Sequence, residues 1–585
     1  TEVRVSEATM AERTSGPSAW ALPERPRVNP ALHTTKPESL TAASRGRVRI
    51  MNPSPARRTN LAGSLTSLPL TGACNPWSEP AEQDRSQTIS IFHTTDLHGH
   101  ITPIEKHEGL RDVGGLARCA SCIRQWRKQS PHSLTVDVGD LYQGTPASLA
   151  TNGRLMVELL NRIGYDAWTL GNHDFDWGPE VLETHLAASR AAVLTGNLSR
   201  SGKQAGRLDG VWENVRPWAM HDVGGFRIAL IGLITPGLPY WLTPETLGGT
   251  EVTDPAASLA NSVREARGEG AHAVVVTGHM GWRFADDYAN PVRELLNAAE
   301  GVDVYLAGHS HQHRSMWMQG NTLCSQASSY GMYCGRVDLT FDTASRELVG
   351  RRACTVLMDD RFEADPLVMQ VANPVLATSE QELTRTICTV MSAIKGRKRG
   401  SPVVVLLCQA FAAALAKQQR PVDGIFHGNF DTKAIATGSL TVGDCWKILP
   451  DENLLATAEL TGRQLVEIVR EDRKDRFSNR TLWPFELTFD QQGAPTRFTL
   501  AGEPVAPDRR YTIGFNSYDG QSGGRRLMTF RACVAAPSAK RHTTSVSCRE
   551  ALIDYCLDTG AIGSSTNWAR PPVIVKVPRS PCPAR

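Results

Sequence analysis

Six short apolar segments that alternate with helix-like segments constrain the fold of this chain more than any other feature of its sequence. They lie between Thr88 and about Arg352 and read TISIFHTTD, SLTVDVGD, DAWTLGNHD, FRIALIGLIT, HAVVVTGHM and VDVYLAGHS. The segments between them, such as GGLARCASCIRQWRKQ and DPAASLANSVREAR, repeat apolar positions at helical spacing. This alternation predicts a layered α/β unit.

The length of the chain, 585 residues, predicts two folded units with flanking segments. After the first unit comes a charged, helix-prone connector, and after it a second unit with the apolar helix VVVLLCQAFAAALAKQ and mixed strands. The expected boundaries are a disordered leader at 1–86, the first unit at 87–355, the connector at 356–400, the second unit at 401–576 and a loose tail at 577–585.

Charge and hydropathy exclude two classes of protein. A net charge of +3, with scattered basic residues, gives no surface for a nucleic-acid polymer. No run of eighteen apolar residues spans a membrane. Oligomeric state leaves no trace in the sequence.

The leader contains a possible export signal that starts at Met51. The paired Arg57 and Arg58 precede a mildly apolar, Leu-rich run and small residues before Cys74, which resembles a twin-arginine signal with a possible lipid anchor at that cysteine. We therefore expect an exported, periplasmic or cell-envelope protein, the alternative being a disordered basic leader without a signal.

The thirteen cysteines are an odd number, so they cannot all pair. Cys119 and Cys122 have the spacing of a redox or zinc pair, but no second pair of that spacing follows. The interpretation is packed thiols or one local disulfide.

Polar residues follow five of these six strands, next to glycines that let the backbone approach an ion or phosphate. Open α/β sheets bind ligands beyond the carboxyl ends of their strands, so five pieces of chain should converge there. Together these side chains suffice for two divalent ions in mixed nitrogen and oxygen sites. They are Asp96, His98, Asp140, Asn172, His173, His279, His309 and His311.

The motifs DLHGH, VDVGDLYQGTP, LGNHDFD, VVTGHMG and LAGHSH resemble those of the calcineurin-like metallophosphoesterases, in particular the 5'-nucleotidase and UDP-sugar hydrolase branch. In the second unit, TGSLTVGDCWKILPDENLLATAELTG resembles the 5'-nucleotidase C-terminal domain. The resemblance implies an α/β fold: a layered metallophosphoesterase β-sandwich flanked by helices, followed by an α+β nucleotidase C-terminal domain.

The resemblance also implies roles for the polar cluster. A first metal would be held by Asp96, His98 and His311, a second by Asn172, His279 and His309, with Asp140 bridging both. Water between the ions would lose a proton and attack phosphorus in line. His173 would serve the developing phosphate charge or the leaving oxygen, oriented by Asp176, with Asp174 as the competing partner. The ligand set suits Mn, Zn and Fe alike.

The second unit departs from the family pattern where it should bind substrate. The loop FHGNFDTKA has Lys433 where an arginine is expected, and His427 and Asn429 are candidates to line the cleft. The late motif FNSYDGQSGGRRLM offers Phe515 or Tyr518 for stacking on a base and Asp519 for a ribose hydroxyl, with ordinary packing as the alternative.

These features predict a two-metal hydrolase of nucleotide phosphate esters, with nucleotide sugars and cyclic nucleotides as further candidates. The alternatives are a sulfur-ester hydrolase of the thiosulfohydrolase kind and a non-catalytic exported metal-binding scaffold. The presence of both His173 and Asp176 argues against the scaffold, which would need the ligands but not this pair.

Overall fold

A computed structural model describes residues 85–563, except 108, 201–209, 284–286, 397, 430–433, 476–477 and 491–494. The predicted leader with Met51 and Cys74, and the predicted tail, lie outside the described residues. Export and lipid anchoring therefore stay predictions. None of the described helices has the length and apolar character that crossing a membrane requires.

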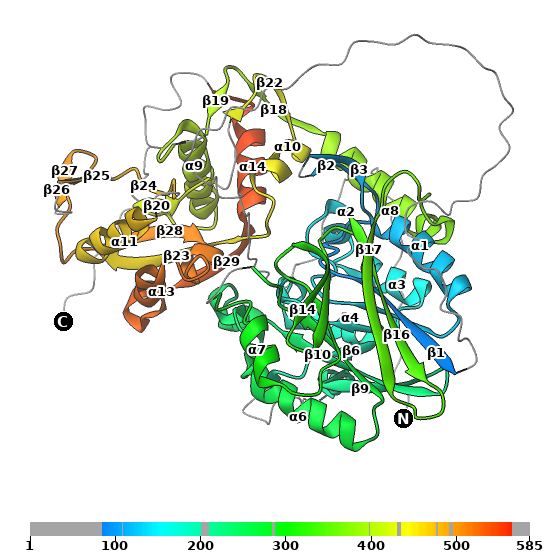
Figure 1. Cartoon of the computed structure of the whole chain (residues 1–585). Coiled ribbons are helices and arrows are strands. Elements are labelled where there is room, and N and C mark those ends of the chain that lie inside the picture. The colour runs from blue at the N-terminus through cyan, green and yellow to red at the C-terminus, as the bar shows by residue number, and fades with distance from the viewer. Residues whose placement is uncertain are drawn as a thin grey trace, which may run out of the picture.

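Two sheets form the framework of the N-terminal unit, from β1 to β17 (Figure 1). The first has seven strands in the order β17 (Leu348–Leu357), β16 (Tyr333–Asp342), β1 (Ser86–Thr94), β4 (Ser133–Asp137), β5 (Ala167–Thr169), β6 (Ala192–Leu194) and β8 (Val215–Arg216). The second has six, in the order β14 (His313–Gln319), β15 (Thr322–Ala327), β13 (Val304–Ala307), β12 (Ala273–His279), β10 (Phe226–Ile234) and β9 (Trp218–Val223). In both sheets the central strands are parallel.

The two sheets pack face to face, and helices cover their outer faces. Ile89 and Ile91 of β1 lie in the core between the sheets, whereas Phe92 lies in the core beneath the outer helices, as the two-residue period of a strand requires. The helices over the first sheet are α1 (Leu116–Gln129), α3 (Arg154–Ile163) and α4 (Pro179–Ala188), and those over the second are α6 (Pro255–Gly268) and α7 (Val292–Ala298). The predicted layered α/β sandwich is confirmed, and all six predicted strands are present.

Short elements complete the N-terminal unit. They are α2 (Pro146–Ala150), α5 (Pro244–Leu247), β2 (Ile104–His107), β3 (Leu110–Val113), β7 (Leu198–Arg200), β11 (Thr250–Val252), η1 (Asn172–Phe175), η2 (Gly210–Asn214) and η3 (Leu238–Tyr240).

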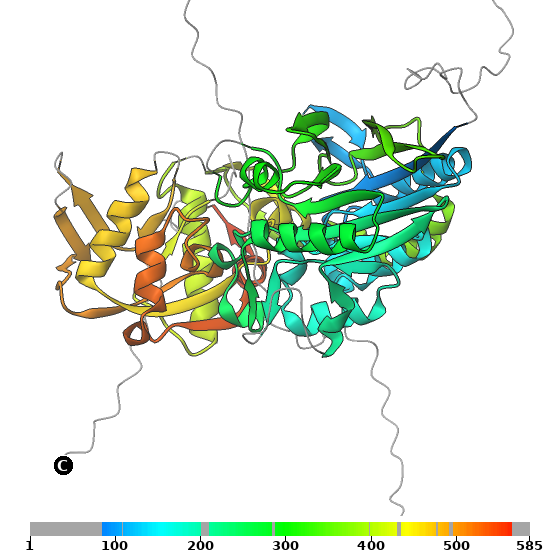
Figure 2. The ribbon, with the colours of Figure 1, turned by 60° about the horizontal axis from the view of Figure 1, so that its bottom comes forward.

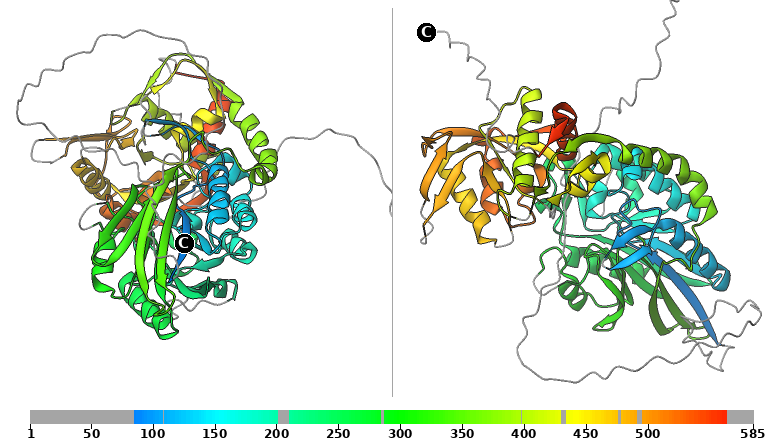
Figure 3. Two further views of the ribbon diagram at one scale, coloured as in Figure 1. Left: turned by 45° about the vertical axis from the view of Figure 1, so that its right-hand side comes forward. Right: turned by 90° about the horizontal axis from the view of Figure 1, so that it is seen from above.

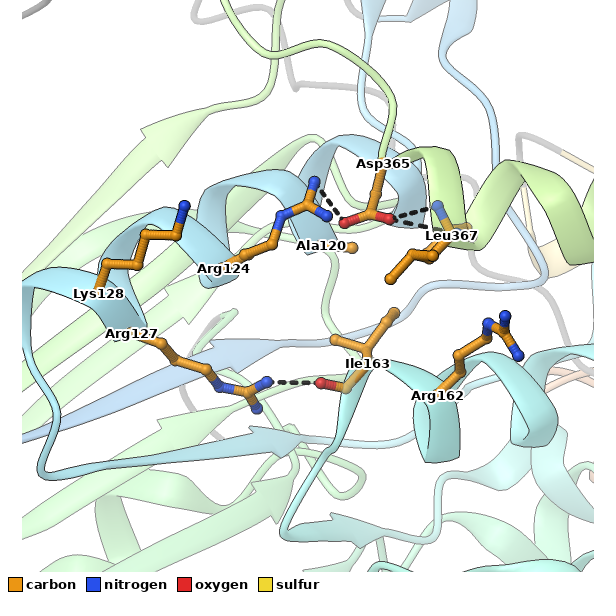
Figure 4. A pocket seen from close by; sticks show the side chains of 9 residues that line it. Ala120, Arg124, Arg127, Lys128, Arg162, Ile163, Asp365 and Leu367 are labelled. Carbon is orange, nitrogen blue, oxygen red and sulfur yellow. Dashed lines mark hydrogen bonds and ion pairs between the residues drawn. The ribbon is translucent and has the colours of Figure 1, made fainter.

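The connector contains α8 (Pro366–Thr384), which lies along α1, α2 and α3 of the N-terminal unit (Figure 3). Asp365 caps this helix by accepting from the backbone amides of Leu367 (2.8 Å) and Val368 (3.3 Å), and it pairs with Arg124 of α1 at 2.7 Å. Figure 4 shows this junction, where basic side chains border a hollow of about 340 Å³ between α1, α3 and α8. The cap and the ion pair fix the position of the first turn of α8 against the N-terminal unit.

The C-terminal unit, from β18 to β30, lies beside the N-terminal unit (Figure 2). Its largest sheet has the order β24 (Thr481–Trp483), β20 (Gly424–His427), β28 (Arg510–Asn516), β23 (Leu454–Thr461) and β29 (His542–Ser547). Two three-stranded sheets have the orders β22 (Gly438–Thr441), β18 (Thr386–Val390), β30 (Ala561–Ile562) and β25 (Glu486–Phe489), β26 (Pro495–Leu500), β27 (Glu503–Pro504). A small pair joins β19 (Ile394–Lys395) to β21 (Ala434–Ile435).

Helices of the C-terminal unit cover its sheets and form two cores. They are α9 (Pro402–Lys417), α10 (Val442–Ile448), α11 (Gly462–Lys474), α12 (Ser517–Gly520), α13 (Met528–Ala535), η4 (Pro537–Ala539) and α14 (Cys548–Thr559). The segment TICTV of the predicted connector forms β18 and pairs with β22 and β30, because its alternating apolar residues face the core. The boundary at 401 stays a prediction.

The described cysteines are free thiols, and Cys119 and Cys122 are buried on α1. Cys119 donates to the carbonyl of Gly331 at 3.3 Å, and a hydrogen bond with Cys334 raises its pKa together with burial. Both side chains belong to the core beneath the outer helices, which agrees with the interpretation as packed thiols.

Candidate metal centre and its surroundings

Six of the seven predicted metal ligands come together where strands of both sheets end. Asp96 and His98 follow β1, Asp140 follows β4, His279 ends β12, and His309 and His311 follow β13. Their ligand atoms form two groups, and within each group the atoms lie within 4.8 Å of one another. The first group is Asp96, His98, Asp140 and His311, and the second is Asp140, His279 and His309. Asp140 belongs to both groups.

Distances within the cluster are those of side chains that share a small space. Asp140 Oδ2 lies 3.1 Å from His279 Nε2 and 3.6 Å from His98 Nε2. Asp96 Oδ1 lies 3.3 Å from His311 Nε2, which is itself 3.1 Å from His98 Nε2. Two imidazole nitrogens at this separation share one proton or one cation, because two unprotonated nitrogens would repel each other.

Backbone carbonyls turn two of the rings toward the centre of the cluster. His98 Nδ1 donates to the carbonyl of Gln143 at 2.9 Å, and His279 Nδ1 donates to that of Val138 at 2.7 Å. With Nδ1 protonated, each Nε2 presents a lone pair to the cluster, which is the tautomer of a metal-binding histidine. Burial lowers the pKa of His98 to about 3 and so keeps its ring neutral.

Asn172 supplies the test of whether the residues fit a metal. Its side chain is buried, and Oδ1 makes no hydrogen bond with any described residue. Buried acceptors are normally satisfied, and a cation satisfies carboxylate, amide and imidazole acceptors at once. The donor set therefore fits divalent cations in mixed nitrogen and oxygen sites.

Backbone strain is concentrated in this cluster. Asp96, His98, Asp140, His309 and His311 all have positive φ, between 47° and 65°. Non-glycine residues rarely adopt this conformation, and where they do it is usually held by surrounding structure at a functional site. Gly171 is needed for another reason: a Cβ there would stand 2.3 Å from both the amide nitrogen and Oδ1 of Asp140.

His173 lies beside the cluster on η1, with its ring edge-on to that of His98 at a centroid distance of 5.1 Å. Its Nδ1 is 2.7 Å from Asp176 Oδ2, and its backbone amide donates to Asp140 Oδ1 at 2.7 Å. Burial alone would lower the pKa of His173, but the carboxylates of Asp176 and Asp140 outweigh it and raise the pKa to about 10. The ring is thus positioned as a proton donor.

Asp174, the alternative partner of His173, is used differently. Its carboxylate accepts from the backbone amides of Asp140 (3.1 Å), Leu141 (2.9 Å) and Gly171 (2.7 Å). It therefore ties the loop after β4 to the loop after β5, and Asp176 is the acid that contacts the imidazole.

The predicted substrate residues of the C-terminal unit do not gather in the same way. Phe515 is fully buried in a hydrophobic core, with its ring 5.0 Å from that of Phe530. The expectation that it stacks on a base is wrong, because β28 is the central strand of its sheet and the ring fills the space under α13. Asp519 is paired with Arg480 at 2.6 Å and accepts from Asn516 at 2.8 Å.

The other residues predicted to contact substrate are buried and bonded to neighbouring residues where the structure describes them. Tyr518 is buried, and its hydroxyl accepts from Arg526 at 3.2 Å. Asn429 is buried and donates to the carbonyl of Gly396 at 2.8 Å, and His427 contacts Asn516 at 2.9 Å. Lys433 lies outside the described residues.

Three features near the cluster carry no signal in the sequence. Trp241 places its ring 5.0 Å from that of His309, and Arg525 of the C-terminal unit lies over the rings of Tyr240 (5.1 Å) and Tyr288 (4.8 Å). Ser522 also reaches across and donates to the carbonyl of Tyr240 at 3.1 Å. The first contact depends on the packing of loops within the N-terminal unit, and the contacts of Arg525 and Ser522 depend on how the two units pack; no local motif encodes either.

Comparison with known proteins gives two family matches. Residues 89–313 match the model of the calcineurin-like phosphoesterases, and residues 375–532 match that of the 5'-nucleotidase C-terminal domain. The trifunctional nucleotide phosphoesterase protein YfkN of Bacillus subtilis is 25% identical over 487 residues, which cover 74% of this chain and 32% of that protein. The chain thus spans about a third of YfkN.

Two further matches extend over nearly the whole of the other protein. Protein UshA of Yersinia enterocolitica is 24% identical over 515 residues, covering 79% of this chain and 91% of UshA. The structure of a 5'-nucleotidase precursor from Thermus thermophilus has a TM-score of 0.61 at 23% identity, covers 81% of this chain and 97% of that one, and shows the shared fold. The two family models together match more than half of the chain, which belongs to the calcineurin-like phosphoesterases of the 5'-nucleotidase type, a family of metal-dependent phosphoesterases.

Proposed function

We propose that the chain hydrolyses phosphate esters of nucleotides with two divalent metal ions. The observation that carries this proposal is the pair of ligand groups that share Asp140, with His173 and Asp176 beside them. One ion would be held by Asp96, His98 and His311. The other would be held by Asn172, His279 and His309, and Asp140 would contribute to both sites. When bound, two such ions polarise phosphoryl oxygens and make water more acidic.

The residues of the chain have separate tasks around this centre. His173, held by Asp176, is directed toward the leaving oxygen and donates a proton to it as the ester bond breaks. The unsatisfied Oδ1 of Asn172 and the inward Nε2 atoms of His98 and His279 would hold cations without adding negative charge. Asp96 and Asp140 bring the only carboxylates of the two ligand groups, which limits repulsion of an anionic substrate.

Nucleotides are the proposed substrates because YfkN and the model of the C-terminal domain are both named for nucleotide hydrolysis. Nucleotide sugars and cyclic nucleotides are included in this proposal. Mn, Zn and Fe all suit the ligand set. The sulfur-ester hydrolase and the non-catalytic scaffold remain alternatives, which a panel of substrates separates.

Hydrolysis by the full chain, loaded with Mn²⁺ or Zn²⁺, tests the proposal, with the product measured for each substrate: phosphate from AMP and the aryl phosphate, phosphate monoesters from UDP-glucose and the cyclic nucleotide, and sulfate from the thiosulfonate. The substrates are AMP, UDP-glucose, a cyclic nucleotide, an aryl phosphate and a carrier-linked thiosulfonate. We expect release from nucleotides at higher kcat/KM than from the aryl phosphate. Turnover of the thiosulfonate alone would establish the sulfur-ester alternative. If the metal-loaded protein turned over none of these substrates, the non-catalytic scaffold would be the remaining alternative.

A further inference from the structure

A cavity lies where the two units meet, and its lining is mainly basic and apolar. It has a volume of about 540 Å³, which is in the range of small-molecule sites. Residues 243–246 of the N-terminal unit line one side, and residues of the C-terminal unit, most of them between 531 and 543, line the other. The charged or titratable side chains of the lining are Arg531, Lys540, Arg541, His542 and a single acid, Glu245. None of the seven metal ligands lines the cavity, and its charge favours an anion.

Arg541 contributes a cation that lacks an anionic partner among the described residues. Its Nη2 is buried and makes no hydrogen bond with any of them, and none of them forms an ion pair with its guanidinium within 4.0 Å. Nη2 lies close to α12, since a Cβ at Gly520 would stand 3.7 Å from it. Burial lowers the pKa of Arg541, and Glu245 offsets this only in part. A buried donor without an acceptor is costly, and an oxygen atom of a bound anion would remove that cost.

Arg531 of α13 contributes a second guanidinium to the same cavity. It lies over the ring of Tyr240 at 5.1 Å, and this contact holds the plane of the group in place. No described residue forms an ion pair with it within 4.0 Å. Lys540 differs, because its Nζ is 3.0 Å from Glu459 Oε1. Two guanidinium groups without an acid partner among the described residues therefore line one cavity.

The chemistry of the lining defines the class of ligand. A guanidinium binds a phosphate through two parallel N–H···O hydrogen bonds, and a phosphate has enough oxygen atoms to bind two such groups at once. A carboxylate, with two oxygen atoms, would serve only one of them in this way. Apolar side chains also line the cavity and would contact an organic group attached to the phosphate. They are Leu454, Val534, Ala535, Ala536 and Pro537.

We propose that this cavity is a second ligand site, which binds a phosphate group between Arg531 and Arg541 at the boundary of the two units. The site is separate from the metal centre, and the inference does not rest on the proposed function. A ligand that fills the cavity contacts both units, so its binding favours the arrangement in which they are packed together. The occupant is inorganic phosphate or an organic phosphate, two sources that differ in whether they use the apolar lining.

Isothermal titration of the full-length, Mn²⁺-loaded chain with inorganic phosphate tests the site. We expect R541Q, which keeps a polar side chain and removes the charge, to weaken one binding event by about tenfold or more. R463Q is the matched control, because Arg463 is an exposed arginine of the same unit that pairs with Asp508, and it should leave every event unchanged. D140N should retain the event that depends on Arg541, because Asp140 belongs to the metal ligands. Affinities of R541Q equal to those of R463Q would overturn the inference, and so would loss of the Arg541-dependent event in D140N.

Phenylphosphonate, which carries an apolar ring on a carbon–phosphorus bond instead of an ester, identifies the occupant. Binding of this probe at the Arg541-dependent event about tenfold tighter than inorganic phosphate would show that the site takes organic phosphates, and equal affinity would show that it takes free phosphate. Phosphate should also raise the temperature of thermal unfolding of the wild-type chain more than that of R541Q. If R541Q is not folded, R531Q replaces it and should weaken the same event.

Discussion

The two units differ in what their buried charges are bonded to. In the C-terminal unit, Asp519 is paired with Arg480, Glu452 with Arg549 and Asp472 with Arg399, so each of these buried acids has a cation from the same unit. In the N-terminal unit, the acids and imidazoles at the strand ends face one another, and acceptors such as Asn172 Oδ1 have no donor among the described residues. Satisfied pairs of this kind stabilise a scaffold, whereas converging unsatisfied acceptors indicate a ligand that is a cation.

Asp451 is the exception that makes the comparison informative. It belongs to the C-terminal unit but has the unsatisfied character of the cluster in the N-terminal unit. Variants of both units test this difference, and their expected effects range from loss of metal to a small change in KM.

Asp140→Asn should have the largest effect, because Asp140 is the one side chain common to both ligand groups. Loss of this carboxylate should reduce bound metal from about two ions per chain to less than one and lower kcat/KM for AMP by roughly a thousandfold or more. Metal content by plasma mass spectrometry and phosphate release measure the two effects. Asp222→Asn, an exposed acid of β9, is the control; two retained ions in the Asp140 variant would refute the shared role.

His173→Ala should keep the metal and lose turnover. Removing a general acid costs about 10²- to 10⁴-fold in kcat, while no ligand of either group is touched. His313→Ala, an imidazole of the same unit that contacts Thr355 at 2.7 Å, controls for loss of a histidine. If kcat for AMP stayed within threefold of wild type, His173 would have no part in proton transfer.

Local sequence patterns make the metal-ligand residues of the N-terminal unit predictable. Asp96, Asp140 and His279 each sit at the end of an apolar strand, so a few residues of sequence indicate both the strand and the group that it presents. Parallel strands bring such ends together within each sheet, and the face-to-face packing of the two sheets brings the two sets of ends together. The six strands and the ligand cluster are therefore predictable from the sequence alone.

The C-terminal unit offers no such local code. Arg480 meets Asp519 across 39 residues, and Arg549 reaches Glu452 across 97, separations in sequence over which no motif extends. The polar neighbours of Phe515 suggest a ring within reach of a ligand, but sheet order places β28 in the centre with its ring in the core. Which side of a strand is buried depends on tertiary packing, and single-sequence patterns do not contain it.

Arg480→Ala tests whether the buried ion pairs of the C-terminal unit stabilise its fold. Breaking a buried ion pair by removing one partner costs about 3–5 kcal/mol, since Asp519 would be left buried without its cation. Urea denaturation should show this loss in the free energy of unfolding. Arg463→Ala, which breaks the exposed pair with Asp508, should leave the free energy of unfolding almost unchanged. A loss for Arg480→Ala no larger than that for Arg463→Ala would mean that Asp519 is available to a ligand.

Arg525→Lys should weaken a contact between the two units and change activity only slightly. Arg525 lies over Tyr240 and Tyr288 of the N-terminal unit, and lysine keeps the charge but loses the planar group that stacks on both rings. A cation–π contact at such a site is worth about 0.5–1 kcal/mol, so KM for AMP should rise about two- to fivefold, with kcat unchanged. Arg497→Lys, an exposed arginine paired with Glu486, is the control. A change in kcat without a change in KM would instead tie this loop to the chemical step, because contacts that only hold the units together around substrate act on binding.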